Sequence, residues 1–221
     1  MELDFLFLLD YTGVLWRGLL TTLQFVALAI MLGLIWGFVL SLARTSDNPI
    51  LYWVSTIYVE FFRGTPVLVQ LFWVFFCLPL FLGINLSGFA SAVIALTLYS
   101  GAITSESFRA ALKSIEKSQF DACTALGLPG SVRTLYVTLP QAVLRAIPNL
   151  LSNVVSLFKE SALVSAVGMA DLMYVGQNIA NSEARPIEIL TTIALIYFII
   201  AFPLTRAVSV VEGRLLKVVK A

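Results

Sequence analysis

Long apolar runs separated by short polar intervals organise the chain, and the lengths of these runs predict helices that cross a membrane. Residues 18–43 carry no charge and are flanked by Arg17 and Arg44. A helix of that length crosses the roughly 30 Å hydrocarbon core of a bilayer with some tilt. We therefore predict the first membrane span over this run.

Residues 64–105 are also uncharged, and this run is long enough for two helices. Proline, glycine, asparagine and serine cluster at residues 79–88 (PLFLGINLSG), which predicts a break there. The second span is therefore expected over about residues 65–79 and the third over about residues 87–111. The preceding segment ILYWVSTIYVEFF, at residues 50–62, is amphipathic and aromatic, so we expect it to lie at the membrane surface.

A polar interval at residues 113–145 precedes two further apolar blocks. The fourth span is expected over residues 146–167, interrupted by Lys159 and Glu160, and the fifth over about residues 189–211. No internal repeat or separate soluble domain is visible in the pattern. The sequence therefore predicts an all-α integral membrane protein with five transmembrane helices.

The composition indicates that the surroundings of this protein are lipid. Of the 221 residues, 59% are hydrophobic and 12% are charged, and the mean hydropathy is +0.94. A soluble domain could not cover so much apolar surface. The net charge is +1 and no basic tract occurs, so nucleic acid is not expected as a partner. Histidine is absent, no metal site is expected, and the placement of Cys77 and Cys123 argues against a disulfide.

The charges that flank the predicted spans set their orientation. If residues 113–145 face the cytoplasm, eleven lysines and arginines lie at inner ends of spans and two at outer ends. The inner set is Arg44, Arg63, Arg109, Lys113, Lys117, Arg133, Arg145, Arg206, Arg214, Lys217 and Lys220, and the outer set is Arg17 and Arg185. Because positive charges are retained on the cytoplasmic side, we predict a periplasmic N-terminus and a cytoplasmic C-terminus.

The segment DACTALG in the polar interval has the features of a short helix. The signals are the capping-box spacing of Ser118 and Asp121, the helical spacing of Phe120, Cys123 and Leu126, and the helix-ending residues Gly127 and Pro129. A helix of about two turns is too short to be stable alone. Its apolar face is therefore expected to pack against its own protein, the membrane surface or a soluble partner.

This segment, followed after nine residues by VTLP, resembles the EAA loop of permease subunits of bacterial ATP-binding-cassette (ABC) importers. That motif is EAA, three residues, glycine, nine residues, an aliphatic residue, one residue, Leu-Pro. The matching positions are Asp121, Ala122, Cys123, Gly127, Val137, Leu139 and Pro140.

Four other segments resemble the polar-amino-acid branch of these permeases: FRGTPVLVQLFWVFFCLP, SIEKSQFDA, LPQAVLRAIPNLLSN and SLFKESALVSAVGMADL. The resemblance covers nearly the whole chain after the first span. The chain departs from the branch at SGAITSE, where Ile103 stands in place of the usual aromatic residue.

The resemblance implies a type I ABC importer permease fold over residues 1–221, in the bacterial inner membrane. A second permease subunit, identical or a sister chain, would complete the pore, and a cytoplasmic ABC ATPase dimer would drive it. A periplasmic solute-binding protein would deliver a polar amino acid or a related zwitterion. The loop at about residues 113–145 would couple the pore to the ATPase through Phe120, Asp121, Ala122, Cys123, Gly127, Leu139 and Pro140.

ATP and magnesium would be bound by the partner ATPase, because this chain has no Gly-x4-Gly-Lys-Ser/Thr phosphate-binding loop. We therefore expect neither catalytic residues nor a cofactor site in this chain. The chain is expected to be a permease subunit and not an enzyme.

Charged residues inside apolar spans are expensive and are functional candidates by default. Glu106 and Arg109 are three residues apart on one helix face and are expected to pair. Adjacent Lys159 and Glu160 point about 100° apart and are not expected to pair. By the resemblance, Glu160 and the face from Ser100 to Glu106 would line a midplane substrate site. The full candidate set is Ser100, Thr104, Ser105, Glu106, Arg109, Ser156, Lys159, Glu160 and Ser161.

Structural roles are the alternative for these residues. Glu106 and Arg109 could form an ion pair at a helix end, Lys159 could extend towards the membrane surface, and the hydroxyls could link helices. A different function would be an ion-coupled secondary carrier that uses Glu106 and Glu160, although the chain lacks the two related halves of many such carriers. A scaffold that only recruits a soluble protein would not explain the buried charges. Dependence of transport on a separate ATPase distinguishes these functions.

Overall fold

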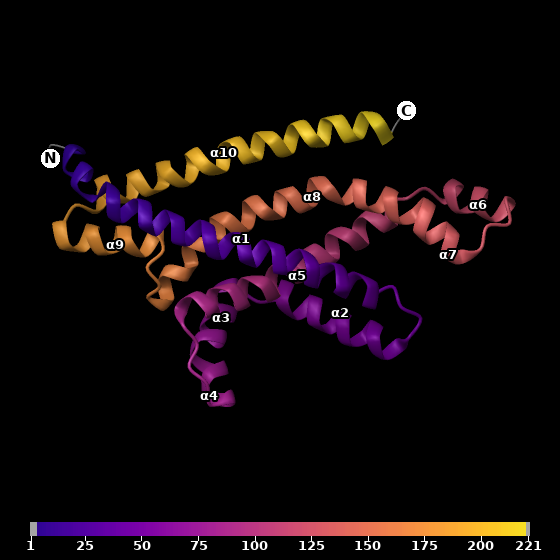
Figure 1. Cartoon of the computed structure of the whole chain (residues 1–221), viewed down its shortest axis with the longest axis horizontal. Helices are drawn as coiled ribbons and strands as arrows, with labels where there is room; N and C mark the ends of the chain where they lie inside the picture. Colours follow the sequence, from indigo (N-terminus) through magenta and orange to yellow (C-terminus); the bar gives the residue numbers. More distant parts are fainter. Residues whose placement is uncertain (1–3, 220–221) are drawn as a thin grey trace.

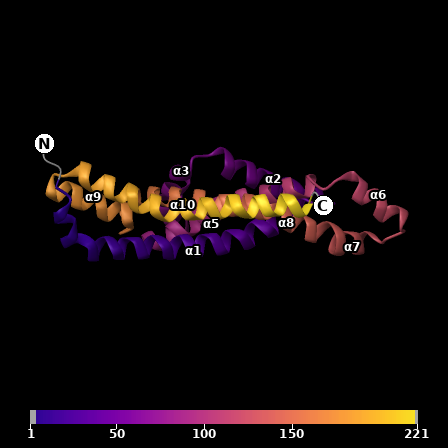
Figure 2. The same cartoon turned by 90° about the horizontal axis from the view of Figure 1, so that it is seen from above.

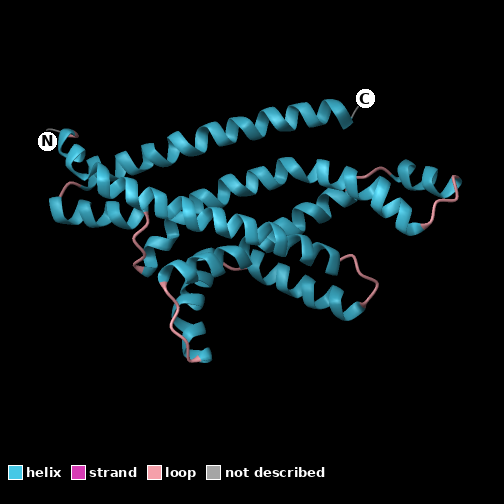
Figure 3. Cartoon of the chain, viewed as in Figure 1, coloured by secondary structure: helices cyan, strands magenta, loops and turns pink. Residues whose placement is uncertain are grey.

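The computed structural model describes residues 4–219, which form an elongated set of helices (Figures 1 and 3). No strand occurs among the residues described. Three of the charges counted for the predicted orientation lie near the C-terminal end of the chain. Lys220 lies outside the described residues, and the side chains of Arg214 and Lys217 lie outside the description as well.

The elements follow one another with few loops. In chain order they are η1 (Leu6–Tyr11), α1 (Thr12–Ala43), α2 (Pro49–Gly64), α3 (Val67–Phe72), η2 (Trp73–Cys77), α4 (Leu78–Leu82), α5 (Gly88–Lys113), α6 (Lys117–Ala125), α7 (Gly130–Val132), η3 (Arg133–Thr138), α8 (Leu139–Glu160), η4 (Ser161–Val167), α9 (Leu172–Glu183) and α10 (Pro186–Val219). Here η1 and η4 are 3-10 helices, whereas η2 and η3 are wound as π-helix.

Four helical stretches of the described chain are long and apolar enough to cross a membrane: Leu6–Ala43, Gly88–Lys113, Gly130–Val167 and Pro186–Gly213. The helix α2 and the helix formed by α3, η2 and α4 satisfy the same criterion only as a pair, which is bent by 108°. The described residues therefore provide four candidate spans, or five if the bent pair is one span. The predicted break after the second span is present, since Gly83 ends α4 with a φ of 64°.

The fourth span begins earlier than the hydropathy predicted. The helix that ends with η4 starts at Gly130, whereas the sequence placed its beginning at residue 146. Polar residues such as Gln141 and Arg145 lie in the first half of this helix, which is why a count of apolar residues missed that part. The guanidinium group of Arg145 donates a hydrogen bond to the carbonyl of Ser114 and so ties this helix to the end of α5.

The helix α2 packs with one face on α1 and α5, and its place at the membrane surface stays a prediction. Val59 is fully buried in a cluster with Leu40 of α1 and Ala102 of α5. The Trp36 indole N–H donates to the Tyr58 hydroxyl at 2.9 Å, and that hydroxyl donates to the Leu98 carbonyl at 2.9 Å. Its amphipathic pattern therefore reflects one face packed on α1 and α5 and an opposite face that is exposed.

The central helix of the structure is α5, which contacts α1, α2, α3 and α8. Its contact with α1 depends on small residues, because a Cβ atom added to Gly37 would lie 2.7 Å from the carbonyl oxygen of Gly101. A Cβ atom on Gly101 would in turn lie 2.6 Å from the Trp36 ring. In lipid, where apolar surface gives helices no preference for one another, such close approach is a main source of association.

The acidic residues of the predicted outer loops are not all accessible. Asp171 is fully buried, where its carboxylate accepts hydrogen bonds from the Met173 and Tyr174 N–H groups and caps α9. Burial raises the pKa of Asp171 to about 6. Glu188 is also buried, whereas Asp4 and Asp10 are exposed. Hydropathy alone does not show that a polar side chain such as Asp171 caps a helix inside the fold.

We expect Gly37→Ala to lower the free energy of unfolding by about 1–3 kcal/mol, because the added methyl group meets backbone of α5 that cannot move independently. Gly13→Ala is the matched control, since it changes the same helix at a position with no atom within 4 Å of the new Cβ. Thermal unfolding of both variants, purified in detergent and followed by tryptophan fluorescence, measures the difference. Equal melting temperatures would contradict a close α1–α5 contact.

Candidate coupling helix and buried polar sites

The helix α6 lies beyond one end of the bundle together with α7, in both views of the molecule (Figures 1 and 2). It rests on the start of the long helix that follows it. The guanidinium carbon of Arg133 lies 5.9 Å from the centre of the Phe120 ring, and the Gln141 amide donates to the Gln119 side chain at 3.3 Å. Cys123 is buried on the same side. The two halves of the EAA-like motif thus form one unit, a short helix and the helix that supports it.

The start of α6 differs from the prediction. Its N-cap is Glu116, whose side chain accepts no capping hydrogen bond. Ser118 is already inside the helix, and its hydroxyl donates to the Glu116 carboxylate at 3.2 Å. The capping box predicted from Ser118 and Asp121 is therefore wrong, because the helix begins before Ser118 and leaves its hydroxyl facing a neighbouring acid.

The end of α6 confirms the prediction. The Leu128 N–H donates to the Cys123 carbonyl and the Gly127 N–H to the Thr124 carbonyl, each at 3.0 Å. Gly127 has a φ of 65°, which lies in the left-handed region. This is the Schellman arrangement, in which glycine satisfies the last carbonyl groups of a helix.

The predicted apolar face of α6 is divided between two sides of the helix. Cys123 is buried and Phe120 half-buried, whereas Leu126 is 76% exposed. Asp121 and Ala122 are exposed as well. Of the other motif residues, Leu139 is half-buried and Pro140 exposed near the start of α8. The free side of α6 therefore presents small residues and one large apolar side chain, which is a surface suited to insertion into a cleft of another protein.

Glu106 of α5 is surrounded by arginines from three helices. It pairs with Arg109 one turn away, with Arg44 at 3.0 Å and with Arg63 at 3.7 Å. The outer carboxylate, Glu60, lies 3.8 Å from Arg44 and 3.5 Å from Arg63. The predicted Glu106–Arg109 pair is confirmed. The roles of Arg44 and Arg63 were missed, because no spacing along the chain shows that the end of α1 and the end of α2 meet on α5.

Glu160 lies at the other polar position, where α8 changes to the 3-10 winding of η4. One of its carboxylate oxygens accepts a hydrogen bond from the Tyr99 hydroxyl at 3.1 Å, and the other is buried without a partner among the described residues. Tyr99 was not predicted as a site residue. It lies one helical turn before Ile103, the position at which the chain departs from the branch pattern, and that departure is the signal that pointed to this part of the helix.

The predicted substrate-pathway residues therefore separate into two places. Tyr99 and Glu106 are seven residues apart on α5, which corresponds to about 10 Å along the helix axis. Glu160 belongs with Tyr99, whereas Glu106 and Arg109 belong to the arginine cluster. The adjacent pair Lys159 and Glu160 forms no ion pair in the part of the chain that the structure describes, as predicted.

The hydroxyl candidates mostly take part in helix packing. Ser100 faces α1, with its hydroxyl 3.3 Å from the Ala29 carbonyl, and Thr104 is buried beside Gly37. Ser161 is buried and donates to the Phe158 carbonyl at 2.6 Å. The two exposed candidates are Ser156 and Lys159. Ser105 is fully buried, and its hydroxyl has no partner among the described residues.

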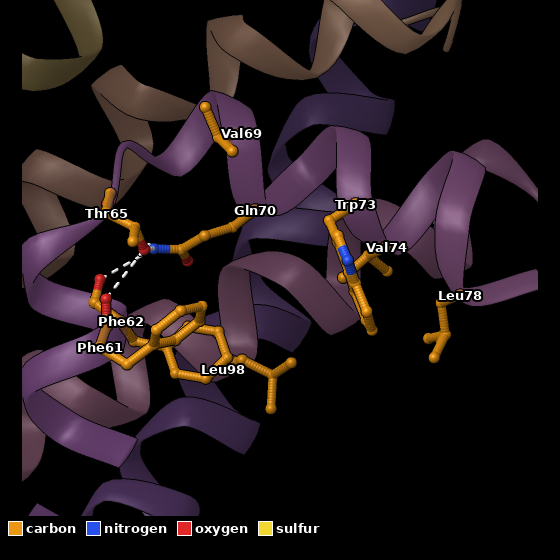
Figure 4. Close-up of a pocket in the computed structure, with 9 residues that line it drawn as sticks. All are labelled: Phe61, Phe62, Thr65, Val69, Gln70, Trp73, Val74, Leu78 and Leu98. Carbon is orange, nitrogen blue, oxygen red and sulfur yellow. Dashed lines mark hydrogen bonds between the residues drawn. The ribbon is translucent and has the colours of Figure 1, made fainter. Parts of the chain in front are cut away.

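An apolar cavity of about 360 Å³ lies between α2, α3, η2 and α5 (Figure 4). Gln70 is its polar feature. The Gln70 amide donates to the carbonyl oxygens of Phe62 and Thr65 at 2.8 and 3.0 Å, which fixes the bend between α2 and α3. The cavity itself was not predicted, because its walls come from separate helices.

Comparisons with known proteins give consistent results over almost the whole chain. Residues 19–217 match the family described as binding-protein-dependent transport system inner membrane component. The arginine transport system permease protein ArtQ of Bacillus subtilis (strain 168) is 36% identical over 97% of this chain and 98% of its own. The putative glutamine transport system permease protein GlnP of Rickettsia conorii (strain ATCC VR-613 / Malish 7) is 34% identical over 90% of this chain and 92% of its own.

A solved structure is similar as well. It is described as an amino acid ABC transporter with histidines, and its sequence is 33% identical to this one. The two superpose with a TM-score of 0.92 over 97% of this chain and 100% of the other. The helical arrangement described above is therefore that of a known membrane transporter subunit.

We expect Glu106→Gln to lower the free energy of unfolding by roughly 2 kcal/mol, because three clustered guanidinium groups then share a single, mostly exposed carboxylate. Glu60→Gln is the matched control and should cost less than about 1 kcal/mol, since exposed ion pairs contribute little. The side chain of Glu60 is 59% exposed, against 19% for Glu106. Thermal unfolding in detergent measures both, and equal losses would show that Glu106 is not the centre of the cluster.

Proposed function

The chain belongs to the family of binding-protein-dependent transport system inner membrane components, the permease subunits of ABC importers, and on this premise we propose that it forms half of the pore of an importer for a polar amino acid or a related zwitterion. The observation that carries the proposal is the full-length match to amino-acid permeases. Hydrolysis of ATP is performed by a separate ATPase subunit in this family, so this chain is not an enzyme.

The exposed side of α6 is the proposed contact with that ATPase. This helix lies beyond the bundle, is held by Phe120 and Cys123, and keeps Leu126 free. Its support is tied to α5 through Arg145, so a displacement of α6 would act on two spans at once. The coupling role proposed for Asp121, Ala122 and Gly127 follows from their position on or beside the exposed surface.

The proposed topology has five spans, with the N-terminus in the periplasm and the C-terminus in the cytoplasm of a bacterial inner membrane. Counting the bent pair of α2 and the helix that follows it as one span supports the number five. The eleven-to-two distribution of lysine and arginine supports the orientation. In this orientation α6 faces the cytoplasm, where ATP is available.

A solute-binding protein is the proposed partner at the opposite end. Asp4 and Asp10 remain exposed there, although Asp171 and Glu188 are buried and cannot contribute. A second permease subunit, identical or a sister chain, is proposed as the other half of the pore.

The proposed substrate contact is Glu160. Tyr99 holds one of its oxygens, and the second is buried and unpaired within the chain, so it could accept a hydrogen bond from the ammonium group of an amino acid. Glu106 and Arg109 are proposed to be structural, because they neutralise each other within the cluster. The same neutralisation weakens the alternative of an ion-coupled carrier, which would require Glu106 to bind and release a cation.

The ATPase should co-purify with the wild-type permease in lipid discs and should be stimulated by a loaded solute-binding protein. We expect Leu126→Asp to reduce the amount of co-purified ATPase by about tenfold or more, because a charge replaces the largest exposed apolar side chain of α6. Leu6→Asp is the matched control, since Leu6 is also 76% exposed but lies at the opposite end of the molecule. Normal ATPase retention in the Leu126 variant would exclude α6 as the docking element.

We expect Glu160→Gln to reduce uptake by about tenfold, the loss of one hydrogen bond to a charged group, while the complex still assembles. The control Glu212→Gln changes an exposed carboxylate near the end of α10 and should leave uptake unchanged. Transport of labelled amino acids into proteoliposomes, with the amount of assembled complex as reference, gives the comparison. Unchanged uptake in the Glu160 variant would assign this carboxylate to structure.

A further inference from the structure

A second cavity, of about 310 Å³, lies at the end of the bundle from which α6 extends. It is formed where the turn between α1 and α2 meets the end of α5. The residues that line it are Arg44, Thr45, Tyr52, Arg109, Leu112 and Lys113. Its volume is at the lower end of the roughly 300–1,000 Å³ found for small-molecule sites. Neither the family match nor the candidate pathway assigns a role to this cleft.

The lining contains three cations and no carboxylate. The acids that form ion pairs with these arginines are Glu60 and Glu106, which together face Arg44, Arg63 and Arg109. Four cations, with Lys113 included, therefore share two carboxylates, which leaves two positive charges without an acidic partner. Such an excess in one small cleft favours the binding of an anion.

Arg44 gives a more specific indication. Its side chain is only 7% exposed, and two of its nitrogens pair with Glu106 and Glu60. The third nitrogen, Nε, is buried and has no hydrogen-bond partner among the described residues. A charged donor left unsatisfied in a buried position is costly. The carbonyl groups at the ends of α1 and α5 attract cations, but they do not provide Nε with an acceptor.

The face of α2 that turns away from the bundle is apolar. Ile50, Trp53 and Val54, on the first turns of this helix, are 72%, 61% and 63% exposed. Tryptophan is enriched where a membrane meets water, with its ring at the level of the headgroups. The cationic cleft and this apolar face lie on different sides of α2, since Ile50 and Val54 point about 160° away from Tyr52. A phospholipid would contact both, with its headgroup in the cleft and its chains along α2, whereas a free phosphate ion would need the cleft alone.

We propose that this cleft binds the headgroup phosphate of an anionic phospholipid, with the acyl chains along the exposed face of α2. The Arg44 guanidinium group, the Tyr52 hydroxyl and the Lys113 ammonium group line the cleft and are the donors for the phosphate oxygens. Basic pockets between membrane helices on the cytoplasmic side are suited to such headgroups. The bound lipid would join the α1–α2 turn to the end of α5, three residues before α6 begins.

The test compares lipid retention in Lys113→Gln and in the matched control Lys117→Gln. Both changes remove one exposed lysine from the same end of the molecule, but only Lys113 lines the cleft. The permease complex, purified and stripped of lipid in detergent, is titrated with phosphatidylglycerol or phosphatidylcholine and studied by native mass spectrometry. We expect the apparent affinity for phosphatidylglycerol to fall about fivefold in Lys113→Gln, the contribution of one lysine near a membrane surface.

Lys117→Gln should bind phosphatidylglycerol like the wild type, and Lys113→Arg should restore binding in a protein that folds normally. The proposal would be overturned if both lysine variants lost the same affinity for phosphatidylglycerol. It would also be overturned if the wild type bound phosphatidylcholine as tightly as phosphatidylglycerol. A third measurement adds inorganic phosphate as a competitor. Full displacement of the bound phosphatidylglycerol by millimolar phosphate would assign the cleft to a free anion instead. The mass measurement does not depend on transport, so its failure is distinguishable from a failure of the proposed importer function.

Discussion

The close contact between α1 and α5 is the constraint on which the rest of the structure depends. In a membrane the lipid chains are as apolar as the side chains, so helices associate through packing and hydrogen bonds and gain little from burial alone. Gly37 and Gly101 allow the two backbones to approach, and Ser100 adds a hydroxyl that reaches the carbonyl of Ala29. The helices α2, α3 and α8 then pack on α5, and α10 packs on α8 and α9.

The fixed position of α5 explains why its polar side chains separate into two sites. Tyr99 points towards α8 and meets Glu160, whereas Glu106 lies nearer the end of the helix and meets arginines from α1 and α2. The Glu106 cluster satisfies its carboxylate within the chain. The Glu160 site does not, because one oxygen is left without a partner among the described residues. Both carboxylates are charged, but only that of Glu160 has an oxygen without a hydrogen-bond partner among the described residues. This difference makes Glu160 the better candidate for contact with a substrate.

The sequence predicted most of the helices, because a long uncharged segment in lipid must pair its backbone N–H and C=O groups internally and therefore forms a helix. It failed where polar residues lie within a helix, as at Gln141 and Arg145, since hydropathy averages over all faces of the helix. It also failed at Ser118, where local spacing could not decide between a cap and an interior position. The EAA-like motif located the docking candidate. It could not show that Phe120 packs on the chain while Leu126 stays exposed, because that difference depends on where the following helix lies.

The residues that the sequence missed share one property, which is that their partners lie on other helices. Arg44, Arg63 and Tyr99 carry no signal in their own neighbourhoods, because the contacts that define them form only when α1, α2 and α8 pack on α5. The same packing connects the two ends of the proposed mechanism. Arg145 binds the end of α5 to the helix that supports α6, and α8 carries that helix on to Glu160. The helical route to the carboxylate is continuous from α7 onwards, and α6 is joined to it by the turn at residues 126–129 and by the contacts of Gln119 and Phe120.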